Sequence, residues 1–239
     1  MKKILIAGAV LAAAAGAASA QDVVRMGTEG AYAPYNFIND AGEVDGFERD
    51  LGDELCSRAG LECVWVTNEW DSIIPNLVSG NYDTIIAGMS ITAERDEVID
   101  FTQEYYPNDP SVFVAMAGGD IGSVVAAQVN TIQSAHVSGM EGVELLEFAT
   151  PEETIAAVEN GEADSVLADG GYLNEVVAAS GGDLEVVGSV VIGGGVGMGV
   201  RESDTELKDA MNAAIASMKE DGSLNALLAE WFPDLDFQY

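Results

Sequence analysis

The sequence predicts an α/β fold with two lobes, in which helices flank parallel-type sheets and a ligand cleft separates the lobes. Short apolar strand-like segments alternate with helix-like segments along the chain, as in doubly wound sheets. Two segments interrupt this alternation: residues 106–110, which contain two prolines, and the triple glycine at 193–195. A chain that leaves one lobe, builds a second and returns would cross at these two segments. We therefore predict lobe 1 from residues 21–108 and 196–239, and lobe 2 from residues 109–195.

In the first predicted lobe, the clearest element is a helix over residues 47–59. Phe47, Leu51 and Leu55 recur there on one face. A helix over residues 73–78 must hold Pro75 in its first turn, since proline breaks a helix interior. The predicted strands of this lobe are the apolar runs at residues 23–27, 63–67, 82–87 and 196–200.

Capping patterns mark two further helices. Thr150-Pro151-Glu152-Glu153 combines a capping box with proline at the first helical position, and the helix should end at Asn160-Gly161. The spacing of Ser203 and Glu206 predicts a second capping box, before a long helix that ends at Asp221-Gly222. A short helix with Trp231 and Phe232 follows. The predicted strands of lobe 2 are residues 112–116, 124–129 and 163–168.

The first twenty residues have the pattern of a secretory signal peptide. Lys2 and Lys3 precede an apolar run over residues 4–15, and small residues at 18–20 allow cleavage before Gln21. This run is shorter than the roughly 20 apolar residues of a transmembrane helix, and no later segment reaches that length. We expect an exported protein that does not insert into a membrane.

Acidic residues dominate the charge of the chain. With 41 Asp and Glu against nine Lys and Arg, the formal net charge is −32. Such a charge repels nucleic acid and anionic membranes, so we exclude both as partners. It also destabilises the compact state unless salt screens it, which suggests a saline habitat. The hydrophobic fraction of 48% suffices for a core, so the acidity does not indicate disorder.

Cys56 and Cys63 are the only cysteines, and we expect them to form a disulfide. In an exported protein both thiols can oxidise, and the residues between them would let a helix end turn back to a strand start. Two buried thiols are the alternative. Zinc is disfavoured because His136 is the single histidine and no second cysteine pair occurs. We expect neither a metal nor a cofactor.

The segment Gly88–Arg95 brings a backbone turn, a hydroxyl and a guanidinium together after an apolar run. Arginine offers a planar fork of donors that matches a carboxylate. A surface ion pair of Arg95 with Glu94 or Asp96 is the alternative. Polar residues also follow four other predicted strands. Because ligands bind beyond the C-terminal ends of strands in such sheets, these loops can converge on one ligand. They are residues 28–35, 68–71, 130–133 and 167–169.

Eight motifs spread over the whole chain support a family resemblance. They are Gly27-Thr28-Glu29-x-x-Tyr32-x-Pro34, Val44-Asp45-Gly46-Phe47, Trp70-Asp71-x-Ile73-Ile74-Pro75, Gly88-x-Ser90-Ile91-Thr92-x-x-Arg95, Ile99-Asp100-Phe101-Thr102, Ala163-Asp164 followed by Asp169, Gly197-Met198-Gly199-Val200-Arg201, and Asp221-Gly222 before Trp231-Phe232. Together they resemble the periplasmic substrate-binding proteins of polar amino-acid ABC transporters, solute-binding protein family 3. This group includes the lysine/arginine/ornithine-, histidine- and glutamine-binding proteins. The resemblance implies a type II periplasmic binding protein fold, and Cys56 and Cys63 resemble the disulfide of the basic amino-acid binders.

The resemblance also implies a free L-amino acid as the ligand. Arg95 would clamp its α-carboxylate, with help from Gly88 and from the backbone of Thr131 and Ile132. Ser90 and Asp169 would hold its α-ammonium. Each charge of the zwitterion would then meet an opposite partner and hydrogen bonds, which removal from water requires.

The remaining implied ligand residues surround the ligand's side chain. Tyr32 and Trp70 would sandwich it, and Glu29 would face its far end. A carboxylate beside electron-rich rings favours a cationic or amide side chain. We rank lysine, arginine or ornithine first, and glutamine or histidine next. Asn130 and Ile132 depart from the glycine and hydroxyl residue that the family usually carries.

The implied function is that of the periplasmic component of an ABC importer. Such a protein is a monomer, closes its lobes on the ligand and delivers it to an inner-membrane permease; it is not an enzyme. One alternative is an enzyme that resembles the cyclohexadienyl dehydratases, with Glu29 or Glu69 as general acid. Another is the sensor module of a receptor, which would need a separate signalling partner.

Overall fold

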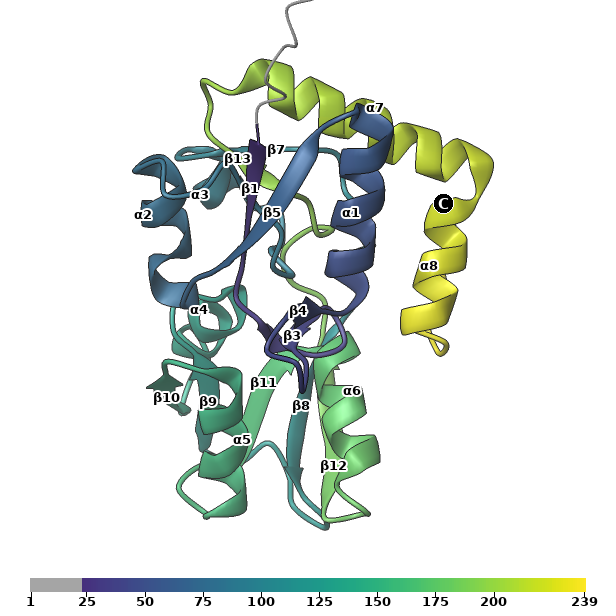
Figure 1. Cartoon of the computed structure of the whole chain (residues 1–239). Helices are drawn as coiled ribbons and strands as arrows, with labels where there is room; N and C mark the ends of the chain where they lie inside the picture. Colours follow the sequence, from purple (N-terminus) through teal and green to yellow (C-terminus); the bar gives the residue numbers. More distant parts are fainter. Residues whose placement is uncertain (1–22) are drawn as a thin grey trace, which may run out of the picture.

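The computed structural model describes residues 23–239 and has two lobes, one above the other in Figure 1. Each lobe contains a sheet flanked by helices, so the predicted α/β fold class is confirmed. The predicted signal peptide, residues 1–20, lies outside the described residues.

The upper sheet in Figure 1 contains mixed strand pairs rather than parallel pairs alone. Its strand order is β5 (Glu62–Thr67), β1 (Val23–Thr28), β6 (Thr84–Ile85), β13 (Gly199–Val200) and β7 (Asp100–Phe101). The strand β1 runs parallel to β5 and β6, whereas β13 is antiparallel to both its neighbours. The direction of β13 is reversed because the chain enters this strand as it comes back from the other sheet. Beside this sheet lie α2 (Ile73–Val78) and α3 (Ala93–Asp96), while α7 (Thr205–Asp221) and α8 (Ser223–Trp231) pack against α1 (Phe47–Ala59).

The helix α1 (Phe47–Ala59) has the predicted bounds and buries the predicted face. Phe47, Leu51 and Leu55 are each 0% exposed. The helix ends at Gly60 in a left-handed conformation (φ 68°), which glycine adopts without strain. The disulfide Cys56–Cys63 then joins α1 to β5, as expected. A small sheet of β2 (Ala31–Tyr32), β3 (Asn36–Ile38) and β4 (Val44–Asp45) precedes α1.

The lower sheet also contains both kinds of strand pair. Its order is β10 (Glu144–Phe148), β9 (Val124–Gln128), β11 (Ser165–Asp169), β8 (Ser111–Met116) and β12 (Leu184–Val190). The strand β9 runs parallel to β10 and β11, whereas β8 is antiparallel to β11 and β12. The helices of this lobe are α4 (Ile132–Ser138), α5 (Pro151–Glu159) and α6 (Gly170–Ala179).

The chain passes from one sheet to the other between β7 and β8 and returns between β12 and β13. Both predicted lobe boundaries fall in these segments; their positions at residues 108 and 195 remain predictions. Two of the predicted strands are shorter than expected. Only Gly199 and Val200 of residues 196–200 belong to a strand, while Val196 forms isolated bridges with Ser90 and Tyr106. Likewise, only Thr84 and Ile85 of residues 82–87 pair as a strand.

One of the two predicted capping boxes is confirmed and the other is wrong. At α5, the Thr150 side chain caps the helix and Glu153 completes the reciprocal bond. At α7, Asp204 takes the N-cap position, and no side-chain capping bond forms. The Ser203 hydroxyl instead donates to the Asp204 carboxylate at 2.9 Å. Two adjacent residues that both favour N-caps compete for one position, and the helix therefore begins one residue later than predicted.

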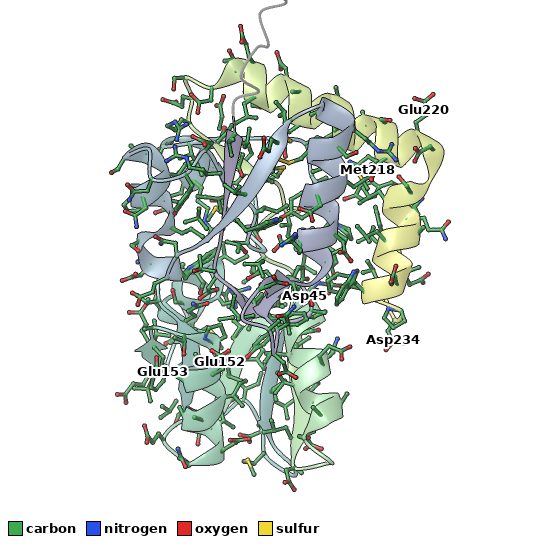
Figure 2. The ribbon with its side chains drawn as sticks, viewed as in Figure 1. Asp45, Glu152, Glu153, Met218, Glu220 and Asp234 are labelled. Carbon is green, nitrogen blue, oxygen red and sulfur yellow. A yellow bond between two sulfur atoms is a disulfide. The ribbon has the colours of Figure 1, made fainter. Side chains whose placement is uncertain are left out.

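The acidic side chains lie largely on the surface. Figure 2 shows Glu153, Glu220 and Asp234 extending away from the ribbon, and all three are exposed. Among residues 23–239, no cluster of His, Cys, Asp and Glu is arranged to hold a metal ion. None of the helices in this part of the chain is long and apolar enough to span a bilayer.

We expect salt to stabilise the fold. Between about 10 mM and 1 M NaCl the Debye length falls from roughly 30 Å to roughly 3 Å, which screens the repulsion among surface carboxylates. The melting temperature should therefore rise across this range, with KCl giving the same rise as NaCl. A scanning calorimetry series in both salts measures it. A melting temperature that stays constant or falls would contradict the repulsion argument.

Candidate amino-acid-binding site

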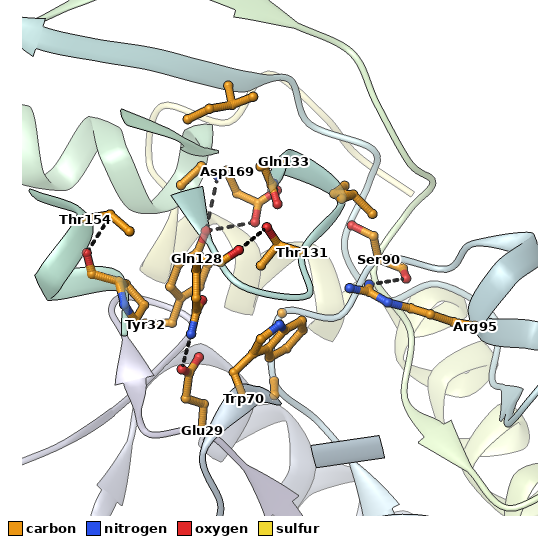
Figure 3. Close-up of a pocket in the computed structure, with 16 residues that line it drawn as sticks. Glu29, Tyr32, Trp70, Ser90, Arg95, Gln128, Thr131, Gln133, Thr154 and Asp169 are labelled. Carbon is orange, nitrogen blue, oxygen red and sulfur yellow. Dashed lines mark hydrogen bonds between the residues drawn. The ribbon is translucent and has the colours of Figure 1, made fainter. Parts of the chain in front are cut away.

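One cavity brings together every residue predicted to contact the ligand (Figure 3). These residues are Glu29, Tyr32, Trp70, Gly88, Ser90, Arg95, Thr131, Ile132 and Asp169. They lie at or beyond the C-terminal ends of strands in both lobes, as the sequence predicted. Seven further residues line the cavity: Ala87, Gln128, Gln133, Pro151, Thr154, Leu167 and Ala168. The sequence indicated a position for Gln133 near the ligand, because residues 130–133 follow a predicted strand.

The guanidinium of Arg95 is held at one wall of the cavity. Thr92 caps the short helix α3 by accepting the Arg95 N–H at 3.2 Å. Arg95 Nη1 donates to the Ser90 carbonyl at 2.9 Å, and the guanidinium carbon lies 5.3 Å from the centroid of the Trp70 ring. Burial lowers the pKa of Arg95 to about 10, which the negative charges of Asp169 and Glu94 oppose.

The alternative interpretation of Arg95, a surface ion pair with Glu94 or Asp96, is wrong. Within residues 23–239, none of the ion pairs includes Arg95. The Arg95 side chain lines the cavity instead, whereas both neighbouring carboxylates lie at the exposed surface.

Asp169 lies at the end of β11, where it begins helix α6. The Tyr32 hydroxyl donates to its Oδ2 at 2.8 Å, and Gln133 Nε2 donates to its Oδ1 at 2.9 Å. Burial raises the pKa of Asp169 to about 6, whereas the Tyr32 hydrogen bond and the Arg95 charge lower it. The Tyr32 ring stacks on Tyr172 with centroids 4.4 Å apart, which holds its hydroxyl in place.

Arg95 and Asp169 thus carry opposite charges at one cavity. They influence each other's pKa, yet no ion pair joins them within the described chain. A cavity with a separated cation and anion is suited to a ligand that carries both charges, because each ligand charge then has an opposite partner.

Glu29 forms a second polar region of the cavity together with Gln128. Figure 3 shows the two side chains pointing toward one another, and Gln128 Nε2 donates to Glu29 Oε1 at 2.6 Å. Burial raises the pKa of Glu29 to about 7; the hydrogen bond from Gln128 lowers it, and the nearby Glu152 raises it. By contrast, Glu69, the other acid considered for catalysis, is exposed and does not line the cavity.

The loop before α4 shows why Asn130 can replace the family's usual glycine. Asn130 has a φ of 58°, a left-handed conformation that glycine adopts freely and asparagine tolerates. Its carbonyl accepts from Trp70 Nε1 at 3.3 Å, across the two lobes. Thr131 caps α4 by accepting the Ser134 N–H at 3.0 Å. The Thr131 hydroxyl is therefore used within its own loop, and Ile132 has no side-chain donor.

The expected role of Gly88 needs correction. Its N–H donates to Oε1 of Glu48 at 2.7 Å and is not directed to a ligand carboxylate. Gly88 still lines the cavity with a φ of 61°, and a Cβ at this position would contact the Tyr32 ring at 3.5 Å. Gly88 therefore contributes a compact turn at the cavity, and its N–H donates to Glu48.

Comparisons with known proteins agree with this geometry. Residues 24–234 match the family model described as bacterial extracellular solute-binding proteins, family 3. The lysine/arginine/ornithine-binding periplasmic protein of Escherichia coli (strain K12) is 29% identical, and the histidine-binding periplasmic protein of the same strain is 31% identical. In each case the match covers 97% of this chain and 97% of the relative.

Solved structures give the same family. A periplasmic His/Glu/Gln/Arg/opine family-binding protein from Silicibacter pomeroyi, in complex with lysine, is 67% identical with a TM-score of 0.88; the match covers 90% of this chain and 100% of that one. An ancestral amino-acid-binding protein described as a precursor of cyclohexadienyl dehydratase is 26% identical, with a TM-score of 0.79 and coverage of 88% and 95%. The fold, the cavity and these matches together establish that the chain belongs to family 3 of the bacterial extracellular solute-binding proteins.

Proposed function

We propose that the protein is the periplasmic amino-acid-binding component of an ABC importer and that its ligand is a free cationic L-amino acid, with lysine, arginine and ornithine preferred. The observation that carries this proposal is the separated pair Arg95 and Asp169 at one cavity. Arg95 binds the α-carboxylate and Asp169, with Ser90, binds the α-ammonium. At about 1.5–3 kcal/mol per charge-assisted hydrogen bond, two or three bonds at each end are sufficient for micromolar binding, near −8 kcal/mol.

The preference for a cationic side chain rests on Glu29. Its carboxylate lies at the same cavity as Tyr32 and Trp70, whose rings provide apolar walls and cation–π contact for an alkyl-ammonium or guanidinium group. The binding of lysine by the Silicibacter pomeroyi relative supports the same preference. A glutamine- or histidine-type ligand is the second choice, since Gln128 and Glu29 can also pair with an amide or imidazole.

Delivery requires a partner in the membrane. The relatives are periplasmic proteins, and some are named as ABC transporter components. By analogy we place this protein in the periplasm as a monomer that closes its two lobes on the ligand and docks on an inner-membrane permease. The crossings between β7 and β8 and between β12 and β13 provide the hinge.

A thermal-shift panel over the common amino acids and ornithine tests the proposal. A ligand at a hundred times its Kd adds about 2.7 kcal/mol to the free energy of unfolding. Lysine, arginine and ornithine should raise the melting temperature most, and aspartate and glutamate least, because the cavity offers no second cation for their side chains. If no amino acid raises it, the proposed function is wrong.

Removing the Arg95 guanidinium should weaken every amino-acid ligand. Arg95→Ala removes two charge-assisted bonds of about 1.5–3 kcal/mol each, so Kd should rise at least about a hundredfold. Isothermal titration calorimetry with lysine and with glutamine measures the effect. The matched control is Arg49→Ala, which removes a partly exposed guanidinium that pairs with Asp53 on α1, outside the cavity. Micromolar binding by Arg95→Ala would contradict the carboxylate-clamp role.

Lysine affinity should depend on pH through Glu29. Because its pKa is about 7 without ligand, the side chain is mostly protonated at pH 6 and must lose that proton to face a bound ammonium. Lysine should therefore bind about tenfold more tightly at pH 8 than at pH 6, since the fraction of ionised Glu29 changes by that factor. The pKa of Asp169 is about 6, so Asp169 is largely ionised above that pH, and its remaining titration affects all amino acids alike.

Titration calorimetry at several pH values with Glu29→Gln as control isolates this effect. The variant should lose the steeper pH dependence of lysine relative to glutamine, and it should bind lysine more weakly at pH 8 while glutamine changes little. Equal pH dependence for lysine and glutamine in the unmodified protein would remove Glu29 from the specificity argument.

An enzymatic alternative also depends on Glu29. A carboxyl group with a pKa near 7 is suited to general acid catalysis, and one structural neighbour is a precursor of cyclohexadienyl dehydratase. Binding is favoured because Arg95 and Asp169 together match an amino-acid zwitterion. Incubation with prephenate or arogenate should leave both compounds unchanged, and turnover would instead assign an elimination reaction to this cavity.

A further inference from the structure

A buried carboxylate outside the cavity connects two of the loops that line it. Glu48 is the second residue of α1 and is 0% exposed. Its Oε1 accepts the Gly88 N–H at 2.7 Å and a hydrogen bond from the Tyr105 hydroxyl. Its Oε2 accepts from Asn36 Nδ2 at 2.7 Å. Within residues 23–239 no ion pair includes Glu48.

Asn36 extends this connection to the loop that carries Glu29. The Asn36 side chain is also 0% exposed, and its Oδ1 accepts the Gly30 N–H at 2.7 Å. Two contacts determine the orientation of the amide, with Oδ1 toward Gly30 and Nδ2 toward Glu48. Glu48 therefore reaches the loop after β1 through Asn36, and the loop after β6 directly through Gly88.

The donors around Glu48 require an acceptor at each of its carboxyl oxygens. The Gly88 N–H and the Asn36 amide nitrogen can only donate, so both carboxylate oxygens must accept. Burying a charge is costly unless it is hydrogen-bonded, and these bonds, with the positive end of the α1 dipole, provide that stabilisation. Burial raises the pKa of Glu48, and the bonds from Tyr105, Gly88 and Asn36 lower it.

We propose that Glu48 is a positioning residue of the ligand site, which holds the Glu29 loop and the Gly88 loop at the spacing that a bound amino acid requires. Glu48 does not line the cavity and acts through Asn36 and Gly88. The two loops provide different parts of the site, since one carries Glu29 and Tyr32 and the other leads to Ser90 and Arg95. This inference rests on the proposed function, because the ligand defines the required spacing.

The substitution Glu48→Gln tests the hydrogen-bond polarity without changing the size of the side chain. If the new amide oxygen faces Gly88 and Tyr105, its nitrogen meets the Asn36 nitrogen, and two donors oppose each other. If the amide is turned round, its nitrogen opposes the Gly88 N–H. In either orientation, the side chain loses its hydrogen bond to one of the two loops. We expect the lysine Kd from titration calorimetry to rise at least tenfold, while Glu54→Gln, a partly exposed control on the same helix that pairs with Arg58, leaves it unchanged.

The double variant Asn36→Asp with Glu48→Gln should restore binding. The introduced aspartate accepts both the Gly30 N–H and the side-chain nitrogen of the introduced glutamine, while the glutamine oxygen keeps Gly88 and Tyr105. The network is then complete, with one hydrogen bond reversed and its charge unchanged. The lysine Kd should return to within about threefold of the starting value, whereas Asn36→Asp alone places two carboxylates in contact and should remain impaired.

Several outcomes would overturn the proposal. One is a Glu48→Gln protein that binds lysine with unchanged Kd. Another is a double variant that melts like the unmodified protein but still binds weakly. If Glu48→Gln alone does not fold, the double variant decides: near-original affinity supports the proposal, and weak or absent binding by a double variant contradicts it.

Amide hydrogen exchange separates this inference from the proposed function. The Gly30 and Gly88 amide protons should be protected in the unliganded protein, lose protection at one of the two sites in Glu48→Gln and regain it in the double variant. If the unmodified protein binds no amino acid, the proposed function fails, and exchange alone then tests the connection between the loops. Unchanged protection at both glycines in Glu48→Gln would refute the connection.

Discussion

Arg95 and Asp169 carry opposite charges at one cavity, and much of the surrounding structure keeps them from pairing with each other. Thr92 caps the backbone N–H of Arg95, and the Ser90 carbonyl holds its guanidinium on one wall. Tyr32 and Gln133 hold the carboxylate on another. A direct ion pair would satisfy both charges and leave a zwitterionic ligand without partners. The separation therefore provides the basis for binding, and local hydrogen bonds maintain it.

The proposed ligand-binding groups also connect the two lobes. Gln128 of the lower sheet donates to Glu29 after β1, and Tyr32 donates to Asp169 at the end of β11. Trp70 adds a third bond to the carbonyl of Asn130. A ligand that enters the cavity exchanges some of these bonds for its own. Because such an exchange has a modest net free energy, selectivity depends on which ligand groups can replace Gln128 beside Glu29.

Much of the fold could be predicted because its signals are local. The apolar face of α1, the Cys56–Cys63 pair and the capping box at Thr150 each depend on residues within one or two turns of chain. Local signals failed where neighbours compete for one role, as at Asp204. They also failed for Glu48, which is one of 41 acidic residues and gives no sign of burial until Tyr105, Asn36 and Gly88 surround it.

The sequence by itself determined the types of chemical group in the site and their order along the chain, because polar residues that follow apolar strands gather at one edge of a sheet. Only the tertiary structure decided which donor meets which acceptor. Tyr32 and Asp169 are 137 residues apart, and Gly88 and Glu48 are 40 apart. Hydrogen bonds depend on distance and direction in space, which the packing of sheets and helices sets. The sequence therefore indicated Gly88 as a donor to the ligand, whereas the structure uses its N–H to hold the loop.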